Sequence, residues 1–189
     1  TAGLDVRELA GSGADVSANV DAENVVAAIE RFSKPLIAAV NGIAITGGVE
    51  IMLACDIVVA SEAARFADTH VKLGLTPGWG LSQRLSRLVG LQRAKELSLT
   101  ARMVSAAEAL DWNMVNHVVP PEALMVKARD IAAEIAQWPP EGVRAMKAMI
   151  DRGFDRPFGE ALAWEARTAS ERNGRVAMSS RKPGASRAE

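Results

Sequence analysis

Residues 41–50 read Asn-Gly-Ile-Ala-Ile-Thr-Gly-Gly-Val-Glu, and this stretch carries most of the information about the fold. The apolar run before it, Pro35–Val40, leads into the Asn-Gly pair, which is typical of a buried strand that ends in a turn. From Gly47 onward the first charge is Glu50 and the next is Asp56, so the sequence predicts a helix buried on nearly all sides. The stretch therefore predicts a strand, a turn and a buried helix with one carboxylate in its first turn.

Gly47 and Gly48 stand at the start of this helix, where backbone N–H groups have no partner within the helix itself. Residues without a Cβ let a ligand approach these N–H groups, and the helix dipole adds positive charge behind them. An oxyanion hole for a thioester carbonyl requires such preorganised donors. The residues alone leave a second interpretation open, in which the glycines allow close packing on a neighbouring segment and Glu50 caps backbone N–H groups.

Further motifs occur in one order along the chain. They are Ala2-Gly3-Leu4-Asp5 followed by Arg7, the 41–50 stretch, Cys55–Ala60, Phe66-Ala67-Asp68, Leu73–Gly78, Gln83-Arg84-Leu85 and Val115–Pro120. In order and spacing these motifs resemble the crotonase family, also called the enoyl-CoA hydratases and isomerases. The resemblance covers most of the chain up to about residue 150. It implies an α/β fold of the crotonase spiral type.

The resemblance also implies how the substrate is bound. It assigns the two N–H groups of the oxyanion hole to Leu4 and Gly47. It brings the backbone of Ala2 to the adenine of coenzyme A and Arg7 to the CoA phosphates, a task that suits the guanidinium fork. On the residue alone, Arg7 is equally well explained as a solvated surface charge. The expected partner is thus an acyl-CoA thioester, with no cofactor beyond the coenzyme A of the substrate.

Glu50 falls on the first of the two carboxylates with which hydratases of this family add water across the α,β double bond. His70 stands where the second carboxylate is expected. A neutral imidazole can accept or donate a proton near neutral pH, so His70 is a candidate for the second catalytic role, with a structural histidine as the alternative. Asp68, two residues earlier, is expected to point to the opposite side if the segment is extended.

These residues together predict an enzyme, a lyase of the enoyl-CoA hydratase type. An isomerase, another crotonase-family reaction and a non-catalytic acyl-CoA-binding homologue stay open, because the resemblance permits family members without the full carboxylate pair. Gly78 and Trp79 precede a predicted helix near the mouth of the pocket. We expect them to border the substrate, with the indole as a wall of the acyl pocket or, alternatively, as a core aromatic.

Composition excludes several other classes of protein. With 189 residues, 49% of them apolar, the chain can bury a sizeable core. A net charge of −1 argues against a nucleic-acid-binding surface, and charges interrupt every apolar run long enough to span a membrane. The single cysteine, Cys55, is expected inside the buried helix and indicates a reducing, cytoplasmic location. We find no metal-ligand pattern in the sequence.

The chain is expected to consist of a partial spiral core with the acyl-CoA site over residues 1–120 and a C-terminal helical region over residues 121–189. The resemblance implies that earlier strands of the spiral precede Thr1, so the chain is expected to be N-terminally truncated. It also implies that the C-terminal helices make a homotrimer or a dimer of trimers. Within the core, Ser105-Ala106-Ala107-Glu108 predicts a capping box at the start of a short helix.

Overall fold

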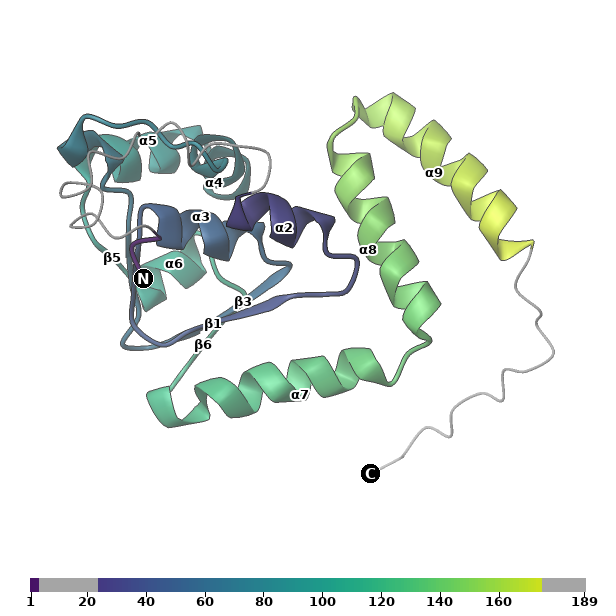
Figure 1. Cartoon of the computed structure of the whole chain (residues 1–189), viewed down its shortest axis with the longest axis horizontal. Coiled ribbons are helices and arrows are strands. Elements are labelled where there is room, and N and C mark those ends of the chain that lie inside the picture. Colours follow the sequence, from purple (N-terminus) through teal and green to yellow (C-terminus); the bar gives the residue numbers. More distant parts are fainter. Residues whose placement is uncertain (4–23, 175–189) are drawn as a thin grey trace. The chain divides into compact units, whose positions relative to one another are not determined.

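The computed structural model describes residues 1–3 and 24–174 of the chain (Figure 1). The chain divides into two compact units, Thr1–Arg144 and Ala145–Glu189. The boundary lies beyond residue 120, so the first of the C-terminal helices belongs to the unit that contains the sheets.

Two small sheets organise the first unit. Strands β1 (Ile37–Val40), β3 (Ile57–Ser61) and β6 (His117–Val119) form a parallel sheet in the order β1-β3-β6. In the second sheet β4 (Arg65–Ala67) pairs in parallel with β2 (Ile43–Ile45) and antiparallel with β5 (Val104–Ser105). The strand predicted in Pro35–Val40 is confirmed as β1.

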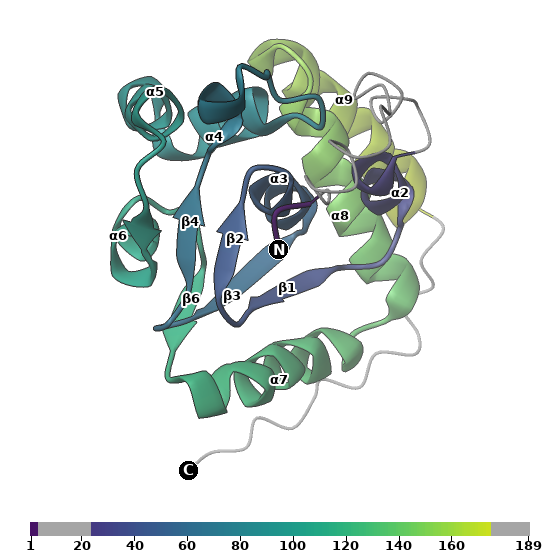
Figure 2. The same ribbon diagram turned by 60° about the vertical axis from the view of Figure 1, so that its left-hand side comes forward.

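Helices pack on both faces of the parallel sheet. The helical segments of the first unit are α2 (Val25–Arg31), α3 (Gly47–Ala54), η2 (His70–Leu73), α4 (Leu81–Val89), α5 (Leu91–Thr100), α6 (Ala106–Asp111), η3 (Pro121–Ala123) and α7 (Leu124–Ala136). Figure 2 shows α3 on one side of β1 and β3 and α7 on the other. The helix predicted from Gly47 is confirmed as α3, although Cys55 is the half-buried residue that follows this helix rather than a residue inside it.

The alternation of side chains along β3 explains this layering. Successive residues of a strand point to opposite faces of the sheet. Val58 and Ala60 therefore enter the main core, which contains Val49 and Met52 of α3, while Val59 faces the other way. On that side Val59 packs with the α7 residues Leu124, Ala128 and Ile131.

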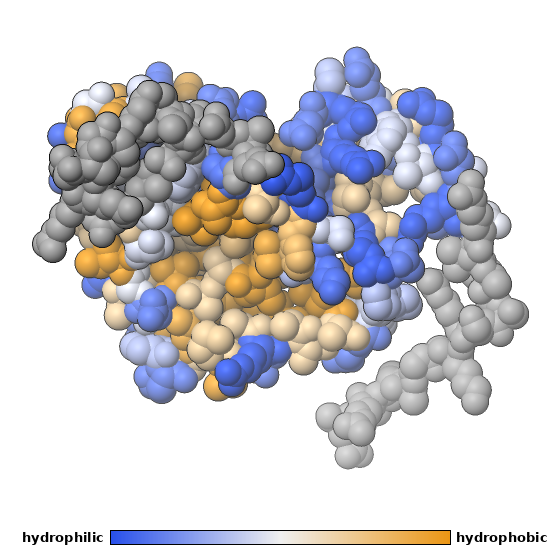
Figure 3. Space-filling model, in the orientation of Figure 1, coloured by the Kyte–Doolittle hydropathy of each residue, from blue (hydrophilic) through white to orange (hydrophobic). Residues whose placement is uncertain are grey.

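Apolar side chains also reach the surface beside β1. Among the described strands β1 pairs with β3 alone, and all four of its residues are half-buried. Figure 3 shows apolar surface between α2 and α7, the region where β1 runs in Figure 1.

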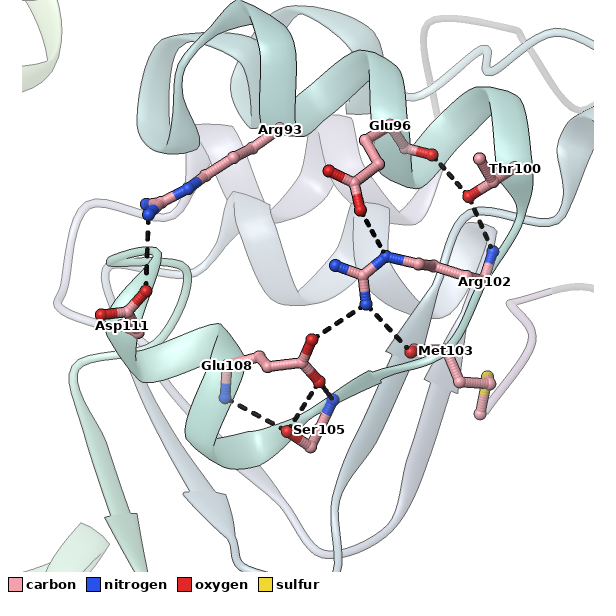
Figure 4. Close-up of polar contacts among 8 residues, drawn as sticks. All are labelled: Arg93, Glu96, Thr100, Arg102, Met103, Ser105, Glu108 and Asp111. Atoms are coloured by element: carbon pink, nitrogen blue, oxygen red, sulfur yellow. Dashed lines mark hydrogen bonds and ion pairs between the residues drawn. The ribbon is translucent and has the colours of Figure 1, made fainter.

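A polar cluster ties α5, β5 and α6 together at the surface (Figure 4). The guanidinium of Arg102 donates to Glu96 at 2.8 Å and to Glu108 at 2.9 Å. The backbone N–H of Ser105 donates to Glu108 at 2.9 Å, and the Ser105 hydroxyl accepts the Glu108 N–H at 3.2 Å, so the predicted capping box is confirmed. We call these four residues the Arg102 cluster. Its Arg102 guanidinium also lies 5.0 Å from the centre of the buried Trp112 ring.

The second unit contains most of helix α8 (Pro140–Phe154) and all of α9 (Phe158–Asn173). Within it the guanidinium of Arg156 lies 4.5 Å from the centre of the Trp164 ring. Five large apolar side chains of these helices are exposed, namely Met146, Ile150, Phe154, Phe158 and Leu162.

Candidate active site

The turn into α3 has an unusual backbone conformation. Thr46 precedes the helix with φ 53° and ψ −116°, and its N–H donates to Ala67 O at 3.0 Å. A positive φ is costly for a β-branched residue, and strained residues of this kind cluster at functional sites. The Thr46 hydroxyl also forms a hydrogen bond with the hydroxyl of Thr69. Thr46 thus links the start of α3 to the residue before His70, a connection that the sequence analysis missed.

The backbone of Thr1–Gly3 lies directly against Gly47 and Gly48. Ile45 N–H donates to Thr1 O at 2.9 Å, which aligns the first residues beside β2. A Cβ on Gly3, whose φ is +89°, would come within 2.6 Å of Gly47 Cα, and a Cβ on Gly48 would overlap the Thr1 carbonyl oxygen. Only glycines fit these positions, so the close-packing interpretation of the glycines is correct. Close packing does not exclude a role of the adjacent N–H groups in binding a ligand.

This packing also places the backbone of residues 1–3 beside the Gly47 amide, which is expected to form one half of the oxyanion hole. Ala2 O would lie 3.1 Å from a Cβ on Gly47, so the backbone of residues 1–3 reaches the start of α3. Within the described residues, the first α3 amides with a backbone acceptor are those of Val49 and Glu50, which both donate to Thr46 O. The N–H groups of Gly47 and Gly48 have no acceptor among the described residues, and they lie at the positive end of the helix. Leu4 and Arg7 lie outside the described residues, so their assigned roles stay predictions.

Glu50 is buried, with 2% of its surface exposed, and one of its oxygens is already occupied. Its Oε1 accepts the backbone N–H of Trp79 at 2.8 Å and that of Leu81 at 3.3 Å. The alternative interpretation, in which Glu50 caps backbone N–H groups, is therefore correct for Oε1, and the N–H groups belong to the segment entering α4. This arrangement fixes the carboxylate and turns Oε2 toward His70, 3.9 Å from Nε2.

Asp68 lies on the same side as His70, which corrects the expectation of opposite sides. The chain leaves β4 at Ala67 and turns into the short η2 helix at His70, so the segment is not extended. As a result Asp68 Oδ1 lies 2.6 Å from His70 Nδ1 and also accepts the His70 backbone N–H at 3.1 Å. A tight turn brings side chains two residues apart together, whereas a strand separates them.

The local environment keeps Asp68 ionised. Burial raises the pKa of its carboxyl group, but hydrogen bonds from the His70 ring, the Ser98 side chain and the His70 backbone outweigh burial and hold the pKa below the ordinary value of 3.8. A carboxylate that accepts several hydrogen bonds is stabilised in its charged form. Ser98 belongs to α5, which packs against η2.

The facing atoms Glu50 Oε2 and His70 Nε2 are too far apart for a direct hydrogen bond. A water molecule at about 2.8 Å from each would bridge them with both of its hydrogens. Within the described residues no buried polar side-chain atom lacks a hydrogen-bond partner, and neither of these two atoms bonds a protein group. Among the described residues, no protein group therefore competes with a water for these two atoms.

Trp79 borders the same site. Its ring atom Cζ3 would lie 3.1 Å from a Cβ on Gly47, so the indole lies beside the first amides of α3. Its backbone position is held from two sides, since Trp79 N–H donates to Glu50 and Trp79 O accepts from Arg84 at 3.1 Å. Gly78, just before it, is exposed, and Gly80 adopts φ 97° as the residue before α4.

The structure therefore brings together six of the residues singled out in the sequence, Ala2, Gly47, Glu50, Asp68, His70 and Trp79, and adds Thr46 and Ser98. Within residues 1–3 and 24–174, no three acidic, histidine or cysteine side chains are grouped so as to hold a metal ion. In the same ranges no helix is both long enough and apolar enough to cross a membrane.

Comparison with known proteins identifies the family of this chain. The sequence profile of the enoyl-CoA hydratase/isomerase family matches residues 1–180. The short-chain-enoyl-CoA hydratase of Clostridium acetobutylicum is 48% identical over 143 residues, which cover 76% of this chain and 55% of that protein. An enoyl-CoA hydratase crystal structure from Bacillus anthracis aligns with a TM-score of 0.80 at 39% identity, covering 89% of this chain and 66% of that one.

A Thermobifida fusca protein solved in complex with CoA gives a TM-score of 0.72 at 32% identity, covering 77% of this chain and 57% of that one. The chain belongs to the enoyl-CoA hydratase/isomerase family and has the crotonase fold that the sequence predicted. It spans just over half the length of the Clostridium acetobutylicum relative.

Proposed function

We propose that this protein adds water to the double bond of an α,β-unsaturated acyl-CoA, as an enoyl-CoA hydratase. The observation that carries the proposal is the 3.9 Å separation of Glu50 Oε2 and His70 Nε2 at the N-terminus of α3. Two proton acceptors at this distance suit one water molecule. The first-turn amides of α3, which have no acceptor among the described residues, suit the thioester oxygen.

In the proposed reaction the water oxygen forms a bond to the β-carbon while His70 Nε2 takes a proton from that water. The electron pair of the double bond moves through the α-carbon to the thioester oxygen, where the N–H groups of Gly47 and Leu4 stabilise the enolate. The imidazolium then returns its proton to the α-carbon and the enolate collapses to the thioester. Glu50 orients the water and offsets the positive charge of the imidazolium.

The remaining contacts with substrate follow from the same assignment. Ala2 and Arg7 would hold the adenine and phosphates of coenzyme A, while Gly78 and Trp79 would border the acyl chain. The reaction as written needs no group beyond the coenzyme A that the substrate carries. The relative solved in complex with CoA supports this choice of ligand.

Assembly and location are part of the same proposal. We propose a homotrimer or dimer of trimers in the cytoplasm. The exposed Phe158 and Leu162 of α9, with 78% and 52% of their surfaces accessible in the single chain, support contacts between copies. Light scattering on purified full-length protein tests the oligomer, and a monomer at micromolar concentration would contradict it.

The test of the activity uses the full-length protein with crotonyl-CoA and with a longer enoyl-CoA. Loss of the enoyl absorbance measures hydration, and calorimetry measures thioester binding in parallel. We expect turnover with at least one substrate. Binding without turnover would favour a non-catalytic acyl-CoA-binding homologue, which the replacement of a family carboxylate by His70 makes the main alternative. Migration of the double bond without hydration would favour an isomerase.

A further inference from the structure

We propose that Asp68 is a positioning residue that fixes the tautomer of His70, so that Nε2 presents a lone pair toward Glu50. This inference rests on the proposed function and deepens it. It makes the acid–base group a carboxylate–imidazole pair, Asp68–His70, in place of a second carboxylate. Asp68 does not touch the reacting atoms and acts only through the imidazole.

The geometry determines which ring nitrogen carries the proton. An ionised carboxylate can only accept hydrogen bonds, so a contact of 2.6 Å between Asp68 Oδ1 and His70 Nδ1 requires a proton on Nδ1. In a neutral imidazole the other nitrogen, Nε2, is then the acceptor. The same Asp68 oxygen accepts the backbone N–H of His70, which locks the carboxylate to the residue that it orients.

The surroundings of the ring keep this arrangement in place. Two charged groups of the described chain contact the imidazole, Glu50 from α3 and Asp68 from the turn before η2. Ser98 of α5 hydrogen-bonds Asp68 from a third element and helps to keep it ionised. Both His70 and Asp68 are buried, at 8% and 2% exposure, so bulk water cannot readily replace either partner.

This tautomer has a chemical consequence. A water between Glu50 Oε2 and His70 Nε2 would donate one hydrogen to each, leaving its oxygen lone pairs free to attack the β-carbon. With the other tautomer, Nε2–H would donate to the water oxygen, and Nε2 could not take the proton that the water must lose on attack. Asp68 therefore decides whether the bridging water is a nucleophile or a hydrogen-bond acceptor.

The test is nitrogen NMR of the protein labelled with ¹⁵N-histidine, together with steady-state kinetics. The chain has only two histidines, and a His117→Gln variant assigns their signals. In the wild type we expect the neutral His70 ring to carry its proton on Nδ1. In Asp68→Asn we expect a mixture of tautomers and a fall in kcat of about 10²-fold with little change in KM, the lower end of the range for one acid–base group.

Asp111→Asn is the matched control, because Asp111 is an exposed carboxylate paired with Arg93 at the surface. It should leave both the His70 signals and kcat unchanged. A wild-type spectrum with the proton of His70 on Nε2 would overturn the inference, even if Asp68→Asn does not fold. Unchanged tautomer and kcat in a folded Asp68→Asn would overturn it as well.

The two proposals fail separately. A wild-type protein that hydrates no enoyl-CoA would refute the proposed function, whereas the NMR spectra would still decide the positioning role of Asp68. A wild-type protein that hydrates its substrate but whose His70 tautomer does not depend on Asp68 would refute only the inference.

Discussion

Two polar networks in this chain use the same kinds of side chain to different ends. In the Arg102 cluster, at the surface, the guanidinium binds two carboxylates. The Glu108 carboxylate also accepts hydrogen bonds from the hydroxyl and the backbone N–H of Ser105. In the site formed by Glu50, Asp68 and His70 the groups are buried, and Oε2 and Nε2 face each other without a direct bond. Saturated polar contacts hold elements together, while acceptors of a buried site that bond no described protein group are available for chemistry.

Energetics separate the two networks as well. Exposed ion pairs contribute about 0–1 kcal/mol each, so the Arg102 cluster adds only a small increment to stability. A buried charged group that loses its partner costs more, because its hydration is not recovered. A change in the site should therefore cost stability as well as activity, whereas a change in the Arg102 cluster should cost only a little stability.

The largest effect is expected for Glu50→Gln. The amide still accepts the backbone N–H groups through its oxygen but presents an NH₂ group to the water, so the water loses an acceptor. We expect kcat to fall by about 10²–10⁴-fold while calorimetric binding of a CoA thioester stays near the wild-type value. Wild-type turnover in this variant would remove Glu50 from the mechanism.

His70→Ala should come next, with a loss of about 10²-fold in kcat. The variant has no imidazole to take a proton from the water, so its activity should depend on pH differently from that of the wild type. Full pH–rate profiles of the two proteins, with His117→Ala as the matched control, measure this difference. Identical profiles for wild type and His70→Ala would reduce His70 to a structural role.

Gly48→Ala probes the packing of the Thr1–Gly3 backbone against the start of α3. The added methyl group overlaps the Thr1 carbonyl oxygen, so we expect a loss of about 1–3 kcal/mol in the free energy of unfolding, together with lower activity. Gly142→Ala in α8 is the control, since a Cβ there meets nothing within 4 Å. Urea unfolding compares them, and equal stability of the two variants would show that Thr1–Gly3 does not pack on Gly48.

The smallest effect is expected in the Arg102 cluster. Hydrogen bonds from the Ser105 backbone and from Arg102 lower the pKa of Glu108 from 4.5 to about 2. Because the folded pKa is the lower one, this interaction stabilises the protein above pH 4.5 and is lost as the pH falls toward about 2.

Arg102→Met removes part of that contribution and should cost at most about 1 kcal/mol at neutral pH, with kcat unchanged. Urea unfolding at neutral pH and at a pH between 2 and 4.5 checks this expectation. The difference between variant and wild type should shrink at the lower pH. A difference that grows on acidification would mean that Arg102 stabilises the fold by another route.

Much of the fold follows from local sequence signals. Short-range patterns predict the apolar strand β1, the buried helix α3 with its single carboxylate and the capping box of α6. Part of the candidate site is equally local, since Gly47 and Glu50 lie in one helical turn. The conformation of Thr46 was missed because threonine rarely adopts a positive φ, so no residue preference signals it.

By itself the sequence determined the elements, the family and the residue types of the site, because hydrophobic periodicity, glycines and caps act over a few residues. Tertiary structure alone decided that Asp68 contacts His70, that Glu50 Oε1 is occupied by the segment before α4, and that Ser98 of α5 reaches Asp68. These contacts depend on how separate elements pack and on a turn stabilised by that packing. Asp68 shows most clearly what the sequence alone could not predict. The sequence analysis expected its side chain and that of His70 on opposite sides, whereas the turn that forms places them on the same side.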